Sequence, residues 1–225
     1  VERLVNDAKK MADLLRKKYP GIPQIILGHS MGSFVTRLLL QKHSDQFSGA
    51  ILVGTGGKMK GISFFKSFLC IKNQLNSHQR SRFINDMFTK MNNRKFQDEP
   101  NADDTSWLSL SLENRGNFKK DPLMDYLFTN NGFYTVLSLI KMATKRSWTK
   151  SIRKDLPLLF VSGEDDPIGD FGKGVRRTVQ NLEEDDFLDV SLRLYPKMRH
   201  EILNEVVKEE VHWEIINWLN ERWKR

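Results

Sequence analysis

The chain has 225 residues, enough to bury a sizeable core as one domain or as a core domain with an insertion. Its formal net charge is +8, hydrophobic residues make up 39% of it, and no apolar run approaches the length of a membrane-spanning helix. The single Cys70 rules out an internal disulfide and favours a reducing compartment, so we predict a cytoplasmic protein.

The chain is predicted to begin with a helix over residues 1–19, where apolar residues recur at helical spacing between Lys and Arg. A short run rich in β-branched residues follows at 23–27 and is typical of a buried parallel strand. Residues 33–40 are then predicted to form a second helix. The five residues between this strand and helix are Gly28-His29-Ser30-Met31-Gly32, which have the form G-x-S-x-G.

A serine between a strand and a helix lies on a sharp, strained turn that exposes its hydroxyl. We expect glycine to be required at both Gly28 and Gly32, because a Cβ at either position would clash where the chain reverses. The N-terminus of the next helix favours negative charge beside Ser30, as a developing oxyanion requires. The motif alone also occurs by chance, but its strand–turn–helix context favours Ser30 as a nucleophile.

A further buried strand is predicted at 49–54, and Thr55-Gly56-Gly57 ends it. Residues 57–150, called the cap segment here, differ in character and are predicted to be a helical insertion between two strands of the sheet. This segment contains 16 Lys and Arg against 8 Asp and Glu, so the whole positive excess of the chain lies in it. Its predicted helices cover 63–69, 82–88 and 133–145.

Two interpretations of the cap segment stay open. Its aromatic and Met residues form either an ordinary helical core or an acyl pocket lined by some of Phe64, Phe65, Phe68, Met87, Phe88 and Met91. Its basic residues form either a solvated face or a surface for an anionic head group or transient membrane contact. The basic residues are dispersed without a recognised motif, so we expect no nucleic-acid partner.

The C-terminal third supplies an acid and a base. A predicted strand at 156–162 ends in Gly163-Glu164-Asp165-Asp166-Pro167, and another at 188–195 is followed by His200. Open α/β sheets place their working residues at such carboxyl ends of strands. Asp165 and Asp166 compete for the acid role. We favour Asp166, because Pro167 holds the residue before it out of a helical conformation.

The other four histidines are not assigned to catalysis. His29 is expected to pack or hydrogen-bond locally, and His43 to end the helix that follows the turn at Ser30. His78 is expected to lie in a polar helical segment and His212 in the terminal helix. The two closing helices are predicted at 170–181 and 209–225, the second being amphipathic.

Together, the blocks around Ser30, Asp166 and His200 resemble the active-site blocks of α/β-hydrolases. The similarity is greatest to the serine aminopeptidase, lysophospholipase and monoacylglycerol-lipase-like branch, to which Arg199-His200-Glu201 is fairly specific. The resemblance implies an α/β fold with a mostly parallel sheet flanked by helices, made by residues 1–56 and 151–225. It also implies that the helical cap of residues 57–150 lies over Ser30 as a lid. It implies Ser30 as nucleophile, Asp166 as acid, His200 as base and the Met31 backbone N–H as an oxyanion donor.

In this family several strands precede the first helix, and a His-Gly-type loop supplies a second oxyanion N–H. We therefore expect the sequence to be a C-terminal piece of a longer hydrolase. Because it opens with Val1 rather than Met, it gives no information on a signal peptide.

The predicted function is hydrolysis of carboxylic esters, of the lysophospholipase or monoacylglycerol-lipase type, by a Ser-His-Asp acyl-enzyme mechanism. An aminopeptidase of the same fold and a non-catalytic binding module are the alternatives. We predict no cofactor, because the sequence has neither paired Cys and His at zinc spacing nor a Gly-rich phosphate loop. The predicted partner is a small ester or lipid substrate, and the sequence gives no oligomeric state.

Overall fold

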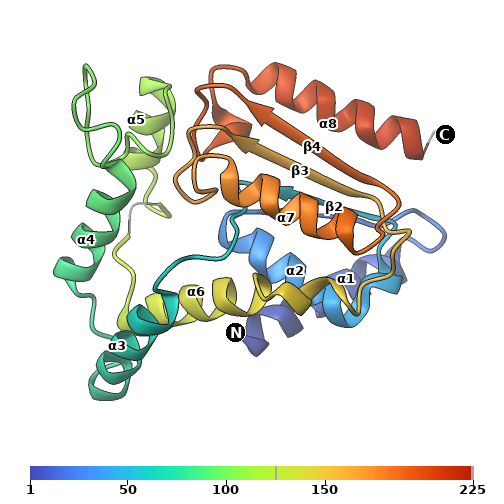
Figure 1. Ribbon diagram of the computed structural model, residues 1–225, viewed down its shortest axis with the longest axis horizontal. Coiled ribbons are helices and arrows are strands. Elements are labelled where there is room, and N and C mark those ends of the chain that lie inside the picture. Colours follow the sequence, from blue (N-terminus) through green and yellow to red (C-terminus); the bar gives the residue numbers. More distant parts are fainter. Residues whose placement is uncertain (125, 224–225) are drawn as a thin grey trace.

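The computed structural model describes residues 1–124 and 126–223. In these residues one sheet of four parallel strands has the order β1-β2-β3-β4 (Figure 1). The strands are β1 Ile25–His29, β2 Gly49–Val53, β3 Leu158–Gly163 and β4 Val190–Tyr195. The strands lie at or within two residues of the positions that the apolar runs predicted.

The register brings the carboxyl ends of the strands to one edge of the sheet. His29 pairs with Val53 at the end of β1, and Gly163 pairs with Tyr195 at the end of β3. Every loop that leaves a strand at this edge therefore begins beside the loops of its neighbours.

Helices cover both faces of the sheet (Figure 1). The helices α1 Glu2–Lys18, α2 Met31–His43, α6 Asn130–Ala143 and α7 Lys173–Glu184 lie on one face, and α8 Lys208–Arg222 lies on the other. Because successive strand residues point to opposite faces, Leu52 and Phe160 pack against the first group of helices. Val53 and Val161 instead pack towards Trp218 on α8. Burial at every position explains why the two central strands, β2 and β3, are nearly continuous apolar runs.

The cap segment contributes α3 Ile62–Leu75, α4 Arg82–Asn93 and α5 Leu112–Lys120 beyond the carboxyl ends of the strands (Figure 1). It has a small core of its own, in which Leu69, Ile84 and Phe133 are buried. Short 3-10 turns occur at Ser44–Gln46, Arg146–Thr149 and Ile202–Asn204. Within the described ranges, no helix combines the length and the apolar character needed to cross a membrane. The division at 57 and 150 into a core and a cap stays a prediction.

Several details differ from the sequence predictions, among them α7, which covers Lys173–Glu184 rather than 170–181. Helix α5 was not predicted, because its sequence LENRGNFKK has almost no apolar periodicity. His78 was predicted to be helical but lies in the turn between α3 and α4. The closing helix begins one residue earlier than predicted and ends at Arg222, and residues 224–225 of its predicted range lie outside the described part of the chain.

Candidate functional site

Ser30 lies between the last residue of β1 and the first residue of α2 with φ 52°, a backbone conformation that few residues other than glycine adopt. Its N–H donates to the Val53 carbonyl (3.0 Å), which fixes the turn to the end of β2. The Ser33 N–H (2.9 Å) and hydroxyl (2.6 Å) both donate to the Ser30 carbonyl. The strain of this turn is thus held by bonds on both sides of Ser30.

The two glycines of the motif are not equivalent. A Cβ at Gly28 would lie 2.5 Å from the Gly32 carbonyl oxygen and 2.5 Å from the Thr36 hydroxyl, so the close approach predicted there is confirmed. The same prediction for Gly32 is wrong, because a Cβ there would meet nothing within 4 Å. Gly32 lies within the first turn of α2, at a position where a side chain would extend into open space.

The structure brings Ser30, His200 and Asp166 together in one line of hydrogen bonds. His200 Nε2 lies 2.8 Å from the Ser30 hydroxyl, and His200 Nδ1 lies 2.9 Å from Asp166 Oδ2. Asp166 is 0% exposed and His200 is 2% exposed. An ionised carboxylate only accepts, so Nδ1 carries a proton and, in neutral imidazole, Nε2 is free to accept from Ser30.

Asp165 and Asp166 have separate roles in the loop after β3. Asp166 Oδ1 accepts from the Ile168 N–H (2.8 Å), which leaves Oδ2 for His200. Asp165 is partly exposed and pairs with Lys95 at 2.6 Å. The geometry therefore places Asp166, rather than Asp165, in the line with His200.

Burial lowers the pKa of His200, but the charge of Asp166, its hydrogen bond and Glu201 outweigh burial, so the pKa is raised above its ordinary value of 6.5. A carboxylate that pairs with imidazolium has this effect because it favours the charged form. His200 is therefore a stronger base than an exposed histidine.

His29 forms part of the wall of the site. Its Nε2 lies 3.1 Å from the His200 carbonyl, and because a carbonyl only accepts, Nε2 donates. Burial, followed by the neighbouring His200, lowers the pKa of His29 and so favours its neutral form. His29 was expected to pack or hydrogen-bond locally; it does form a hydrogen bond, but the partner lies 171 residues away in the chain.

Two glycines outside the motif let the loops close over the site. Gly54, with φ +54°, leaves room for the rings of His29 and His200, each of which would lie about 3.2 Å from a Cβ there. A Cβ at Gly163 would lie 2.1 Å from the Met198 carbonyl oxygen. A glycine at the end of a strand often marks a close approach of another backbone, so the positions of Gly54 and Gly163 in the sequence could have indicated these contacts.

A loop of the cap segment contacts the His200 loop directly. The Trp107 ring lies 5.1 Å from the His200 ring between centroids, and the Glu201 N–H donates to the Leu108 carbonyl (2.7 Å). The Arg199 guanidinium donates to the Ser106 carbonyl (2.6 Å). No sequence pattern indicated these contacts.

Met31 is the first residue of α2, so its N–H is among those that a helix leaves without a partner inside the helix. This placement suits the predicted oxyanion donor, whose role stays a prediction. His43 ends α2 as predicted, and His212 lies in α8 beside the Leu203 carbonyl (3.0 Å). Neither is a hydrogen-bond partner of Ser30, Asp166 or His200 in the described part of the chain.

Comparison with known proteins places this geometry in a family. Residues 1–207 match the family described as "Serine aminopeptidase, S33". The chain belongs to the serine aminopeptidase S33 family.

Among solved structures, a thermostable carboxyl esterase from Bacillus coagulans aligns with a TM-score of 0.88 and 23% identity, covering 96% of this chain and 70% of that one. A monoglyceride lipase from Saccharomyces cerevisiae aligns with a TM-score of 0.73 and 20% identity, covering 100% of this chain and 69% of that one. These similarities confirm the predicted α/β-hydrolase fold.

Human monoglyceride lipase is 37% identical over 49 residues, which are 22% of this chain. The matched segment spans about a sixth of the length of that relative (16%).

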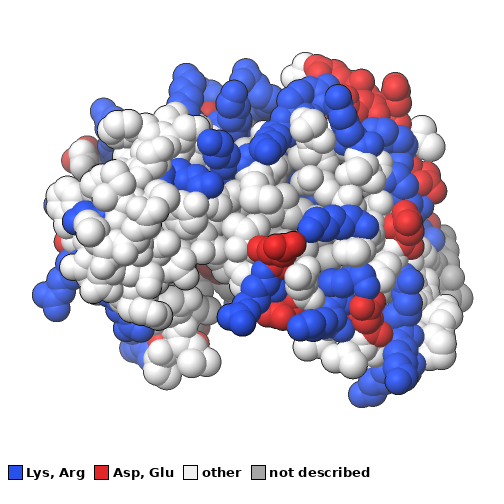
Figure 2. Space-filling model, turned by 90° about the horizontal axis from the view of Figure 1, so that it is seen from below, with Lys and Arg blue, Asp and Glu red and all other residues white. Residues whose placement is uncertain are grey.

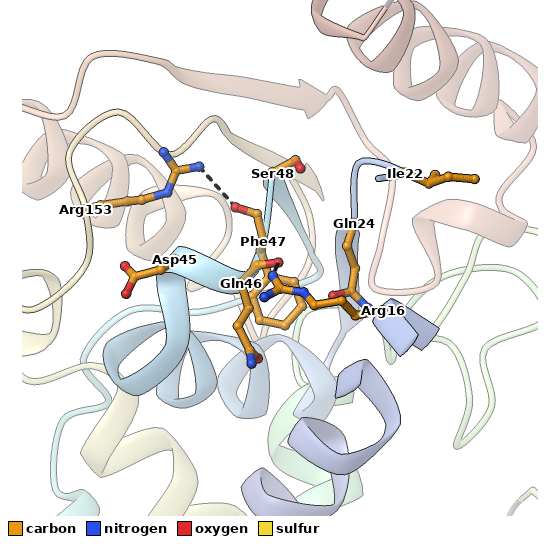
Figure 3. Close-up of a pocket in the computed structure, with 8 residues that line it drawn as sticks. All are labelled: Arg16, Ile22, Gln24, Asp45, Gln46, Phe47, Ser48 and Arg153. Atoms are coloured by element: carbon orange, nitrogen blue, oxygen red, sulfur yellow. Dashed lines mark hydrogen bonds between the residues drawn. The ribbon is translucent and has the colours of Figure 1, made fainter. Parts of the chain in front are cut away.

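In this S33 family member one cavity lies far from Ser30. A cavity of about 390 Å³ opens at the amino ends of β1 and β2, opposite the carboxyl edge (Figure 3). Arg16 and Arg153 line it, and the Arg153 guanidinium donates to the Phe47 carbonyl (3.0 Å). Among the described residues, no group of three or more His, Cys, Asp or Glu is arranged to hold a metal ion.

The candidate acyl-pocket residues divide into two groups. Phe64 is 76% exposed, and Phe68, Met87 and Met91 are exposed as well. Phe65 is half-buried and its ring packs edge-on against Phe64. Phe88 is half-buried, and its ring packs edge-on against Trp107, with the ring centroids 5.8 Å apart.

The two motif glycines should respond differently to alanine. Gly28→Ala should destabilise the fold by about 1–3 kcal/mol, because its Cβ overlaps backbone at Gly32. Gly32→Ala should be neutral or stabilise by up to about 1 kcal/mol, because alanine favours a helix more than glycine does. Urea denaturation of both variants measures the difference, and equal destabilisation would contradict the assigned geometry.

Proposed function

We propose that this protein hydrolyses carboxylic esters through an acyl-enzyme on Ser30. The observation that carries the proposal is the hydrogen-bonded line from Asp166 through His200 to the Ser30 hydroxyl. A nucleophile within reach of a base, which a third group orients, is the arrangement that acyl transfer requires.

In the proposed reaction, His200 Nε2 takes the Ser30 proton as the hydroxyl oxygen attacks the ester carbonyl. The Met31 N–H stabilises the resulting oxyanion, and Asp166 stabilises the imidazolium. The bond to the alcohol then breaks, and the alcohol leaves with the proton from His200. A water molecule next gives a proton to His200 as its oxygen attacks the acyl carbonyl. The bond between the acyl carbon and the Ser30 oxygen then breaks, His200 returns the proton to that oxygen, and the acid is released.

A monoacylglycerol or lysophospholipid is the proposed substrate type. The short match to human monoglyceride lipase and the apolar residues of the cap segment support it. The family description favours an aminopeptidase as the second candidate. That activity needs acidic groups to hold a free amine, whereas Asp165 already pairs with Lys95 and Glu164 with Arg176. Because both carboxylates are already paired, an ester substrate is favoured over a peptide with a free amine.

A fluorophosphonate probe tests the nucleophile. We expect the protein to be labelled and to hydrolyse a monoacylglycerol faster than an aminoacyl arylamide, and we expect Ser30→Ala to abolish labelling and lower hydrolysis by at least about 10³-fold. Ser33→Ala is the matched control and should keep labelling, because the backbone N–H of residue 33 still donates to the Ser30 carbonyl (2.9 Å) when the hydroxyl is removed. A folded protein that the probe does not label would favour the non-catalytic binding module.

The pH dependence of kcat/KM tests the base. Only neutral imidazole accepts a proton, so the rate should fall as the pH drops through the pKa of His200. Because that pKa is raised, the midpoint of the acid limb should lie above 6.5. Asp166→Asn removes the charge that raises it, so the limb should move to lower pH and kcat should fall by about 10⁴-fold. An unchanged limb would contradict the assignment of Asp166.

We also propose that the cap segment contacts a negatively charged lipid surface. Along α3, Phe64, Phe68, Ile71 and Leu75 follow a helical spacing and are all exposed. Figure 2 shows the cap lobe, on the left, as a largely uncharged surface with Lys and Arg at its margins. Apolar residues flanked by cations favour an anionic interface.

Sedimentation with lipid vesicles tests this contact. The protein should bind phosphatidylserine-containing vesicles more strongly than neutral ones, and Phe64→Glu should weaken binding several-fold. Leu188→Glu is the matched control, because Leu188 is similarly exposed (78%) but lies outside the cap segment just before β4. Equal loss in both variants, or no preference for the charged vesicles, would contradict the proposal.

A further inference from the structure

The Trp107 ring lies against the catalytic base assigned above. The centroids of the Trp107 and His200 rings are 5.1 Å apart, and their planes are inclined by 30°, so the two rings are close to stacked. The distance is within the roughly 6 Å at which an aromatic face attracts a cation. Trp107 comes from the loop between α4 and α5, more than 90 residues before His200 in the chain.

The loop that carries Trp107 is bound to the His200 loop on both sides of the indole. The bonds are those from the Arg199 guanidinium to the Ser106 carbonyl (2.6 Å), from the Glu201 N–H to the Leu108 carbonyl (2.7 Å) and from the Leu110 N–H to the buried Glu205 carboxylate (2.9 Å). The same Glu205 carboxylate also accepts from the Arg199 N–H (3.2 Å). The backbone at Trp107 therefore has little freedom to move relative to His200.

The cap segment fixes Trp107 from its other side. The backbone N–H of Trp107 donates to Asn93 Oδ1 (2.7 Å) at the end of α4. The indole packs edge-on against Phe88, whose ring lies 5.8 Å from Phe133 in the small core of the cap segment. Held in this way, the indole ring is already in place before a charge forms on His200.

The charge on His200 is the difficult part of the proposed reaction. Proton transfer from Ser30 creates an imidazolium in a position that is almost completely buried, and burial disfavours the charged form. The face of an indole carries negative potential, so it attracts imidazolium more strongly than neutral imidazole. An interaction that is stronger after proton transfer than before it lowers the barrier.

We propose that Trp107 is a positioning residue for His200 that holds the imidazole over Ser30 and stabilises the imidazolium during acyl transfer. The proposal rests on the proposed function, because it concerns the charge that acyl transfer creates. The charged and titratable groups that face His200 are Asp166, Glu201 and His29, while the Arg199 guanidinium is turned away towards Ser106, Glu99 and the Phe96 ring.

Substitution of Trp107 by leucine and by phenylalanine tests this role. Trp107→Leu keeps an apolar side chain over His200 but removes the aromatic face, so we expect kcat to fall about ten-fold with little change in KM. Trp107→Phe restores a face and should keep kcat within about three-fold. Trp213→Leu is the matched control: the same substitution at a position on α8 that is 65% exposed should leave kcat unchanged.

The titration of His200 separates this role from simple packing. With the indole face removed, imidazolium loses stabilisation, so the pKa of His200 and the acid limb of kcat/KM should move down by about 0.5–1 pH unit in Trp107→Leu. If Trp107 only filled space, its loss would admit water and move the pKa upwards. Nuclear magnetic resonance of the imidazole measures this pKa without any turnover.

The outcomes distinguish the two proposals. A parent protein that is neither labelled by fluorophosphonate nor active on esters overturns the proposed function, and this inference with it. A labelled, active parent whose Trp107→Leu variant keeps its kcat, or whose His200 pKa rises or stays the same, overturns the inference alone. A fall in both quantities that Trp107→Phe largely restores supports it.

Discussion

The hydrogen bond between Asp166 and His200 is the interaction on which the rest of the site depends. Asp166 is fully buried, and a buried carboxylate without partners is strongly destabilising. Its two oxygens are divided between the Ile168 N–H and His200 Nδ1, so the same bonds that satisfy the charge also orient the imidazole towards Ser30. Stability and the candidate chemistry therefore depend on one pair of side chains.

The parallel sheet and three closely packed glycines allow Asp166 and His200 to meet beside Ser30. The carboxyl ends of β1, β3 and β4 share an edge, which brings together residues that are 34 and 170 positions apart. The loops then approach each other within van der Waals contact, and glycine at positions 28, 54 and 163 supplies the space. At Ser30 the turn itself is strained, because a residue other than glycine has a positive φ (52°), as often occurs at functional sites.

The cap segment takes part in the site rather than only covering it. The loop around Trp107 is bonded to Arg199, Glu201 and Glu205, and the Trp107 ring continues through Phe88 into the small aromatic core of the cap. The surroundings of His200 consequently include residues from both the core and the predicted insertion. A displacement of the α4–α5 region would change the environment of the imidazole directly.

Much of this arrangement could be predicted from local sequence patterns. The strands β1, β2 and β3 were found because their sequences are apolar runs typical of buried parallel strands, and the serine was found because strand, tight turn and helix adjoin in the sequence. Asp166 was favoured over Asp165 through the effect of Pro167 on its neighbour, which is again a local effect. The helix α5 was missed because its stability does not come from an apolar stripe of its own.

Local sequence patterns predicted the four strands, most of the helices and the candidate nucleophile, acid and base, because each of these features depends on neighbours in the chain. The folded chain alone reveals that Gly32 faces open space, that Lys95 pairs with Asp165, and that His29 and Trp107 contact His200. These contacts join segments separated by about 70 to 171 residues, and no local periodicity specifies which distant side chains packing will bring together.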